Sequence, residues 1–555
     1  MTHDPSSSAP SSSVRIRLEP LSVEFDLPRG SSLVPSLAAH GIEFPCGGMG
    51  ECSGCQVRVL SGSLPVTEAD AAALTPDQLA KGWRLACQAH ASNHSNAPLV
   101  LECLQWHMQI LTDEKPRPDE KLPCPIHSES AAADSGWVGE PTLTTSVAPF
   151  FPAASSRERV GDRPASSSNN LAIAIDLGTT TIAAQLIDAA GNVLAVETAL
   201  NPQAAFGSDV MSRIRAALDG QDLTTPIRVA LGQLVARLAA RLDLARASQV
   251  SEILLVGNTV MHHLFCGLSV EPLAHVPFQS PHLAEQRFTA RDLGWAINSD
   301  CIIRFARCIG GFVGSDILAG IVAAGIANGS DLTALVDLGT NGEIAIGNRH
   351  GIVCASTAAG PAFEAGAIRM GMRAVTGAIA YVALADGALR TTVIGDVAPR
   401  GICGSGLVDA VAAGLRSGAV LANGRIADSS RIFPIAPPVV LYQSDIRELQ
   451  LAKGAIAAGF RLLLKHLDAR AHALHAIHLA GAFGNYVQIE SALRIGLLEA
   501  PHTLIHAAGN TALRGAKMLL LAEEPPLPPV EHISLAADPD FQDEFADCMS
   551  FPEPS

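Results

Sequence analysis

Ile173-Ala-Ile-Asp-Leu-Gly-Thr-Thr-Thr181 is echoed 161 residues later by Ala334-Leu-Val-Asp-Leu-Gly-Thr-Asn-Gly-Glu343 in this 555-residue chain. In both copies an apolar run ends in Asp-Leu-Gly-Thr, and a second apolar run follows, at 182–187 and at 344–346. A strand, a tight glycine turn and a second strand form a β-hairpin. Because the pattern recurs about one domain further along the chain, it predicts two similar α/β domains whose hairpins face one cleft.

The residue types in the two turns suit a phosphate group. Glycine lets the backbone approach phosphate closely, threonine hydroxyls and N–H groups bind its oxygens, and an aspartate reaches Mg²⁺ directly or through water. We therefore interpret Asp176 and Asp337 as catalytic carboxylates, either of which could orient the attacking water. Glu343 is a candidate general base, with an exposed hairpin carboxylate as the equal alternative. The candidate phosphate-binding residues are Gly178, Thr179, Thr180, Gly339, Thr340 and Asn341.

A third motif covers Ile477–Tyr486, where an apolar run leads into a glycine-rich stretch. An apolar strand that ends in such a turn would let adenosine lie against the backbone, bordered by Gly481, Gly484 and Asn485. Gly360 opens a turn after the second hairpin that could close over phosphate. Together the three motifs resemble the phosphate-1, phosphate-2 and adenosine motifs of the ASKHA superfamily, which includes sugar kinases, Hsc70-type chaperones and actin. The resemblance implies a two-lobed ATPase that binds ATP and Mg²⁺.

Four cysteines near the start of the chain indicate a second cofactor. Three stand in the loop Cys46-Gly-Gly-Met-Gly-Glu-Cys52-Ser-Gly-Cys55, and the fourth is Cys87. This spacing is close to that of plant-type [2Fe–2S] ferredoxins, with one extra residue in the first gap. The sequence therefore predicts a [2Fe–2S] cluster ligated by Cys46, Cys52, Cys55 and Cys87. The remaining cysteines lack ligand spacing, and most lie in apolar stretches where cysteine is a small core residue.

The predicted domain order follows from these motifs and from composition. In the N-terminal domain we expect a hairpin over 14–27, a helix over 32–40 and strands at 56–60 and 99–104, which resembles the β-grasp fold of [2Fe–2S] ferredoxins. The region 112–168, rich in Pro, Ser and Ala, reads as a linker. The full prediction is a disordered tail (1–13), the ferredoxin-like domain (14–111), the linker (112–168), ASKHA lobe I (169–330), ASKHA lobe II (331–540) and a C-terminal tail (541–555).

Composition limits the class of partner. The formal net charge of −16 argues against nucleic acid or an anionic membrane surface, because phosphate backbones require concentrated Lys and Arg. No apolar run approaches the roughly 18 residues of a membrane span. Twelve cysteines with a cluster-type spacing and no signal peptide indicate a reducing cytoplasm. We expect a soluble cytoplasmic protein.

The combination of a ferredoxin-like domain, a linker and an ASKHA domain resembles the reductive activators of corrinoid proteins. The resemblance covers the ferredoxin region and nearly everything from Leu171 to Pro552. Several further strings are similar to that family: Asn201-Pro-Gln203, Gly207-Ser-Asp-Val-Met-Ser-Arg-Ile214, Val256-Gly-Asn-Thr-Val-Met-His-His263, Gly310-Gly-Phe-Val-Gly-Ser-Asp316 and Pro539-Asp-Phe-Gln-Asp-Glu-Phe545.

The resemblance implies ATP-dependent repair of a cobalamin cofactor. Such activators pass one electron from the cluster to inactive Co(II) and restore Co(I) for methyl transfer. A plant-type cluster has a potential near roughly −400 mV, and the cobalt couple is expected to lie lower, so that ATP must assist an uphill step. The implied partners are a corrinoid-binding protein or cobalamin-dependent methyltransferase and an upstream electron donor, either a reductase or a ferredoxin. A homodimer is left open.

Two other functions fit parts of the sequence. Activators of 2-hydroxyacyl-CoA dehydratases are also ASKHA proteins, but their cluster cysteines lie inside that domain, and here four cysteines precede residue 90. A non-catalytic, nucleotide-switched binding module with a redox-sensing cluster is the alternative from a different class. His262 and His263 invite a metal-ligand interpretation, against which we expect one packed and one surface histidine.

Overall fold

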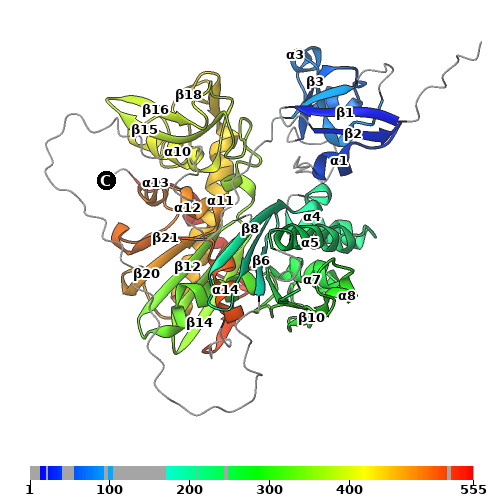
Figure 1. Ribbon diagram of the computed structural model, residues 1–555. Coiled ribbons are helices and arrows are strands. Elements are labelled where there is room, and N and C mark those ends of the chain that lie inside the picture. The colour runs from blue at the N-terminus through cyan, green and yellow to red at the C-terminus, as the bar shows by residue number, and fades with distance from the viewer. Residues whose placement is uncertain are drawn as a thin grey trace, which may run out of the picture.

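The structure, a computed structural model, describes residues 13–19, 23–39, 55–92, 98–103, 171–207, 209–242, 248–339, 341–521 and 527–553. It contains a small N-terminal domain and two larger lobes, each built on a six-stranded sheet (Figure 1). Several predictions fall outside the described residues: the tail up to residue 12, the linker over 112–168, the ligands Cys46 and Cys52, the phosphate-turn residue Thr340 and the side chain of Asn485.

The N-terminal domain is a mixed sheet in the order β2-β1-β5-β3-β4. Its strands are β1 (Ser13–Glu19), β2 (Val23–Pro28), β3 (Gln56–Ser61), β4 (Trp83–Leu85) and β5 (Leu99–Cys103), with helix α1 (Val34–Ala39). The predicted hairpin, helix and two strands are all present within a few residues. The sequence analysis missed β4 and the short helices α2 (Glu68–Ala73) and α3 (Pro76–Ala80). Both helices begin with a capping box, which is a readable start signal.

The first lobe has a sheet in the order β10-β11-β9-β6-β7-β8. Helices α4, α5, α7 and α8 belong to the same lobe (Figure 1). The bounds of these elements are β6 (Leu171–Leu177), β7 (Thr181–Ile187), β8 (Val193–Leu200), β9 (Val250–Val256), β10 (Gln286–Thr289), β11 (Ile302–Phe305), α4 (Val210–Leu218), α5 (Thr224–Ala239), α7 (Thr259–Cys266) and α8 (Ala290–Leu293).

The second lobe repeats this topology. Its sheet has the order β21-β20-β12-β13-β14-β22. In each lobe three antiparallel strands (β6, β7, β8 and β12, β13, β14) are extended by two parallel ones (β9, β11 and β20, β21). The duplication predicted from two turns therefore extends over five strands of each sheet, whereas the sixth strand differs: β10 pairs with β11 in the first sheet and β22 with β14 in the second. The strands are β12 (Leu332–Leu338), β13 (Gly342–Asn348), β14 (Gly351–Thr357), β20 (Leu474–Ala480), β21 (Ile505–Gly509) and β22 (Val530–His532).

Two helices cross where the lobes meet, α9 (Ser315–Ala324) and α14 (Thr511–Leu521). A Cβ atom on Gly515 would lie 2.0 Å from the carbonyl oxygen of Ala319, so only glycine permits this approach. Apolar residues of α14 pack on the first sheet, and Ile317 and Ile321 of α9 pack on the second. The crossing therefore links the two sheets mechanically.

The second lobe also carries an outer part that the sequence analysis did not resolve into elements. It contains β15 (Ala378–Ala385), β16 (Ala388–Val393), β17 (Gly401–Ile402), β18 (Ile432–Ala436), β19 (Val439–Tyr442), α10 (Gly404–Ser417), α11 (Gln443–His466) and α13 (Ile489–Arg494). The segment expected as a C-terminal tail contains helix α15 (Phe541–Met549), which packs on α11. Cys548 of this helix is buried, and the following Phe551 joins the core of the lobe.

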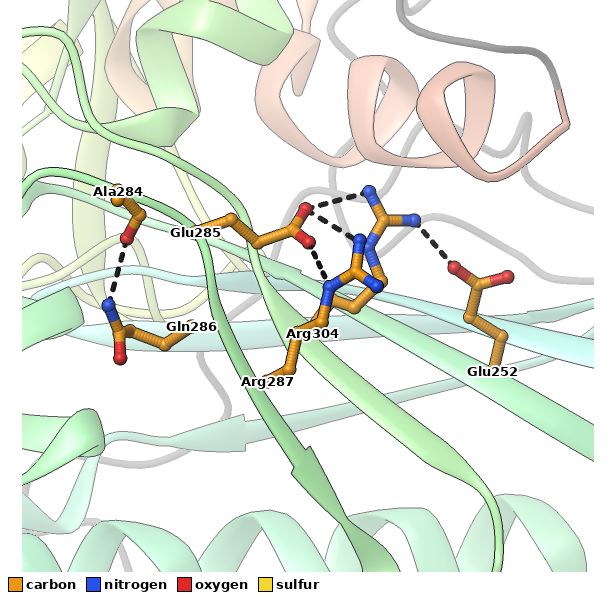
Figure 2. Close-up of polar contacts among 6 residues, drawn as sticks. All are labelled: Glu252, Ala284, Glu285, Gln286, Arg287 and Arg304. Carbon is orange, nitrogen blue, oxygen red and sulfur yellow. Dashed lines mark hydrogen bonds and ion pairs between the residues drawn. The ribbon is translucent and has the colours of Figure 1, made fainter.

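An ion-pair network ties the edge of the first sheet together (Figure 2). Arg304 of β11 pairs with Glu252 of β9 at 2.5 Å and with Glu285 at 2.8 Å, and Glu285 also accepts from Arg287 of β10 at 2.6 Å. Burial opposes ionisation of Glu285, yet the hydrogen bonds from Arg304 and Arg287 leave its pKa below the usual value. The network spans three neighbouring strands, so it has a structural role in this sheet.

Candidate functional site

The first predicted phosphate turn is a closed hairpin. The Gly178 N–H donates to the Thr181 carbonyl at 2.9 Å, and a Cβ on Gly178 would lie 2.7 Å from that oxygen. Thr179 is buried and its hydroxyl oxygen accepts from Asn258 Nδ2 at 2.9 Å. Asn201 donates from Nδ2 to the Gly178 carbonyl and from its backbone N–H to the Thr180 carbonyl, both at 2.9 Å. Hydrogen bonds from Asn201 and Asn258 thus fix the conformation of the turn.

The second turn is also closed by a backbone hydrogen bond, but over a shorter span than the first. The Gly339 N–H donates to the Asn341 carbonyl at 3.1 Å, which closes the turn between β12 and β13. The side chain of Asn341 is hydrogen-bonded to Glu343. Glu343 stands opposite Asp337 in the antiparallel register, so the two side chains share one face of the sheet.

Four carboxylates from four elements gather between the two turns. Asp176 ends β6, Asp337 ends β12, Glu343 begins β13 and Asp316 lies in the first turn of α9. The three aspartates are half-buried, whereas only 6 % of Glu343 is exposed, so the alternative of an exposed hairpin carboxylate is wrong. Asn510 donates to Asp176 at 2.8 Å and joins the second lobe to the first.

Burial raises the pKa of all four groups, and repulsion between carboxylates adds to it at Asp316, Asp337 and Glu343. Desolvation raises the pKa of Asp176 to about 6, against a hydrogen bond from Asn510 that lowers it. Desolvation and the charge of Asp176 raise the pKa of Asp337 to about 7. Desolvation, followed by the charges of Asp316 and Asp337, raises the pKa of Glu343 well above its usual value. Such crowding of acidic groups is typical of a site whose counter-charge arrives with a ligand.

The described residues contain no group of three or more His, Cys, Asp or Glu side chains placed to hold a metal ion. The donors at this site are carboxylates, which suit Mg²⁺, because that ion keeps several waters and is bound through one or two carboxylates together with nucleotide phosphates. Asp176 and Asp337 would hold such an ion, and Mg²⁺ would supply charge to the phosphates there.

Asp316 provides a test of this crowding. Desolvation raises its pKa from 3.8 to about 8, so the folded state holds the proton more tightly than the unfolded state, and stability falls as the pH rises from about 4 to about 8. We expect Asp316→Asn to stabilise the nucleotide-free protein at pH 8 by about 1–3 kcal/mol and to have little effect near pH 4. Thermal denaturation at both pH values checks this. Asp331→Asn, at an exposed carboxylate before β12, should change neither.

The predicted adenosine motif differs from expectation in its local structure. Strand β20 leads straight into helix α12 (Gly481–Tyr486) instead of a turn. Gly481 has φ +82°, and a Cβ there would lie 2.5 Å from Oδ1 of Asp337, so this glycine is a steric requirement. Gly484 is buried within α12, where a Cβ would lie 3.3 Å from the backbone of Leu479. It therefore lets the helix pack closely on β20.

Gly360 opens the loop after the second hairpin, as predicted, with φ +74° and open space around it. The loop continues into a 3₁₀ helix over Pro361–Glu364. The Phe363 ring of this helix packs at a tilt against the Phe483 ring of α12, with ring centroids 4.7 Å apart. The Gly360 loop and the adenosine motif are therefore packed against each other.

In the N-terminal domain the fold brings together the two cluster cysteines that the structure describes. The Ala86 N–H donates to the Cys55 carbonyl at 2.9 Å, so that Cys87 lies next to a residue bonded to Cys55. Both cysteines belong to the same buried core, and Gln88 Nε2 lies 3.8 Å from the Cys87 sulfur. A buried thiolate pair with a nearby N–H donor fits an iron–sulfur cluster, whose potential depends on such hydrogen bonds.

Other residues proved different from expectation. His262 and His263 are both fully buried, so the expected surface histidine is wrong. His263 bonds to the Thr259 carbonyl and to Ser280, each at 2.7 Å, as a core residue does. Asn201, Asn258 and Asp316 stand in strings that the sequence analysis had set apart, but it gave them no role at the site, and it did not notice Asn510.

Three family models match the chain. The 2Fe-2S iron–sulfur cluster binding domain matches residues 16–92, the RACo middle region matches 171–329, and the C-terminal domain of RACo, the ASKHA domain, matches 331–555. The match to the middle region falls within the range 169–330 that we predict as the first lobe, and the domain bounds stay a prediction. No helix in the described parts of the chain is both long and apolar enough to cross a membrane.

Similar proteins match between about two thirds and nearly all of the chain. The corrinoid activation enzyme RamQ of Eubacterium limosum is 34% identical over 410 residues, which cover 67% of this chain and 69% of that protein. The [Co(II) methylated amine-specific corrinoid protein] reductase of Methanosarcina barkeri is 26% identical over 381 residues, 63% of this chain and 69% of that one. The solved structure of a reductive activator for corrinoid, iron-sulfur protein matches with a TM-score of 0.60 and 26% identity, covering 97% of this chain and 98% of that one.

Proposed function

Because this chain belongs to the family of reductive activators of corrinoid proteins, the RACo family, we propose that it uses ATP to return an oxidised corrinoid partner to its active state. In this reaction one electron passes from the N-terminal cluster to Co(II), which becomes Co(I), and the upstream donor then re-reduces the cluster. The protein is an ATP-dependent iron–sulfur reductase that serves methyltransferase systems.

The observation that carries the proposal is the pairing of two sites in one chain. Two hairpins with the same turn chemistry face each other across four half-buried or buried carboxylates, and the same chain presents Cys55 and Cys87 in one core. A sugar kinase does not require a domain with cluster cysteines, and a ferredoxin does not require a pair of phosphate-binding hairpins.

Each site residue has a definite task under this proposal. The N–H groups and hydroxyls of the two turns bind and orient the phosphates, and Asp176 and Asp337 hold Mg²⁺ and position water. Glu343, buried and with a raised pKa, accepts a proton from that water. Cys46, Cys52, Cys55 and Cys87 hold the cluster, which stores one electron. We also propose a cytoplasmic location, a methyltransferase corrinoid partner and a reductase or ferredoxin as donor; a homodimer stays a prediction.

The decisive experiment uses the full chain, reconstituted and reduced without oxygen, and a purified corrinoid protein in the Co(II) state. The absorption of Co(I) should appear only when Mg-ATP is present. The amount of Co(I) formed should be proportional to the number of electrons that the reduced cluster held at the start. Free cob(II)alamin without the partner protein is the control for unspecific reduction. A sample that binds ATP and holds its cluster, yet yields no Co(I) with any corrinoid protein of its own methyltransferase systems, would instead favour the redox-sensing module.

A further inference from the structure

In the described residues, the cluster domain contacts the first lobe at a short segment. Helix α1, which directly precedes the cysteine loop, packs against the 3₁₀ helix η2 (Pro202–Phe206), and Ala205 of η2 joins the hydrophobic core of the N-terminal domain. Figure 1 shows α1 on the side of its domain that faces β8 and α4. We call η2 the seat of the cluster domain.

Asn201, the residue immediately before the seat, also forms hydrogen bonds to the first phosphate turn. Asn201 caps η2 by accepting from the Gln203 N–H at 3.0 Å through Oδ1. Its Nδ2 and backbone N–H donate to the carbonyls of Gly178 and Thr180. One buried side chain, 1 % exposed, therefore joins the phosphate turn to the first residues of the seat.

The rest of the seat is anchored to the body of the lobe. Gln203 is buried and donates from Nε2 to the Leu223 carbonyl at 2.8 Å. Arg213 of α4 is buried and donates from Nε to the Gly207 carbonyl at 3.0 Å. The hydrogen bonds of Gln203 and Arg213 hold the seat to the lobe and do not involve the phosphate turn. We therefore look to the hydrogen bonds of Asn201 as the path by which nucleotide at the turn can affect the seat.

From this connection we infer that Asn201 is a positioning residue, through which nucleotide bound at the first phosphate turn tightens the seat of the cluster domain. The inference rests on the proposed function in taking the turn as a phosphate site. When the turn's N–H groups bind phosphate, polarisation of the peptide groups makes the carbonyls of Gly178 and Thr180 better acceptors, so that both bonds from Asn201 strengthen. The seat becomes more rigid, and the cluster domain docks more firmly before it delivers its electron.

Hydrogen exchange measured by mass spectrometry tests the inference on the full chain, with and without a saturating non-hydrolysable ATP analogue and Mg²⁺. In the natural protein the analogue should slow exchange in η2 and in α1 about threefold. In Asn201→Ser the hydroxyl can still cap η2 but is too short to reach the Gly178 carbonyl. This variant keeps the backbone bond to the Thr180 carbonyl, so it should bind the analogue at saturation, yet lose the part of the nucleotide effect on α1 that the bond to the Gly178 carbonyl transmits.

A second pair of variants separates docking from coupling. Ala205→Glu places a charge in the apolar contact and should speed exchange in α1 severalfold with or without nucleotide, while the analogue binds as before. Ala190→Glu introduces the same change at an exposed turn at the opposite end of β8 and should alter neither α1 nor η2. The inference is overturned if nucleotide leaves α1 and η2 unchanged in the natural protein, or if Asn201→Ser retains the full effect.

Electron transfer to the corrinoid protein is measured on the same samples, and this distinguishes the two proposals. If the natural protein delivers no electron while nucleotide still slows exchange in α1, the proposed function fails and the coupling stands. If electrons are delivered with Mg-ATP but exchange in α1 ignores nucleotide, the coupling through Asn201 fails and the function stands.

Discussion

Replacing Cys87 by alanine will abolish reduction of the corrinoid partner and leave nucleotide binding intact. Cys87 is one of the predicted cluster ligands and is buried in the core of the N-terminal domain, next to Ala86, which is bonded to Cys55. A cluster that has lost one thiolate assembles poorly, whereas the ASKHA lobes do not depend on it for their fold. We expect visible absorption of the cluster and formation of Co(I) to fall together, by about 100-fold or more for the electron-transfer rate.

Cys548→Ala is the matched control, because Cys548 is equally buried but packs against Ala457 and Ala458 of α11, in another domain. It should keep cluster absorption and Co(I) formation within about twofold, as for a core cysteine that serves only packing. A Cys87→Ala protein with full cluster absorption and normal delivery would show that Cys87 is not a ligand. The chain would then need another fourth donor.

The repeated turns were enough to predict the duplicated architecture, because sheet topology follows from local patterns when both copies keep them. A strand, a glycine turn and a second strand are fixed by neighbours in sequence, and the bond from Gly178 to Thr181 spans only three residues. The same holds for the hairpin of β1 and β2. Local chemistry of this kind is readable without knowledge of the rest of the fold.

The partners behind the turns were not predictable in this way. Asn201 meets Gly178 across 23 positions, Asn258 meets Thr179 across 79, and Asn510 meets Asp176 across 334. Each contact exists only because the sheets and the crossing helices bring distant segments together, and nothing in the neighbouring residues of an asparagine reveals it. The burial of Glu343 has the same origin, since a hairpin tip is exposed unless another lobe covers it.

We expect the crowded carboxylates to link binding of Mg-ATP to the arrangement of the two lobes. In the nucleotide-free protein Asp176, Asp316, Asp337 and Glu343 compete for protons, as their raised pKa values show. We expect a divalent cation that binds with the nucleotide to offset this repulsion. The free energy of binding should then be most favourable in the arrangement that brings the four carboxylates closest together around the cation. We therefore expect Mg-ATP to bring the two lobes that contribute these groups closer together.

Asp337→Asn will therefore suppress ATP-dependent activation by about 100-fold or more while retaining the cluster and the fold, because the amide keeps the shape of the side chain and loses the charge that holds Mg²⁺. Burial and the charge of Asp176 raise the pKa of Asp337 to about 7, so the ionised form that binds the cation grows as the pH rises through 7. In the natural protein kcat/KM for ATP hydrolysis should rise across this range, since it reports the free enzyme.

In Asp337→Asn the rise of kcat/KM with pH should flatten. Nucleotide should still bind through the two turns, and titration with a fluorescent ATP analogue checks this. Asp331→Asn, at the exposed carboxylate that precedes the same strand, should keep the natural profile and rate. Gly481 gives an independent check of the geometry, since any side chain there would press on Oδ1 of Asp337 from 2.5 Å. Gly481→Ala should thus reproduce the loss of hydrolysis in Asp337→Asn with the carboxylate still present, and normal hydrolysis in either variant would remove Asp337 from the site.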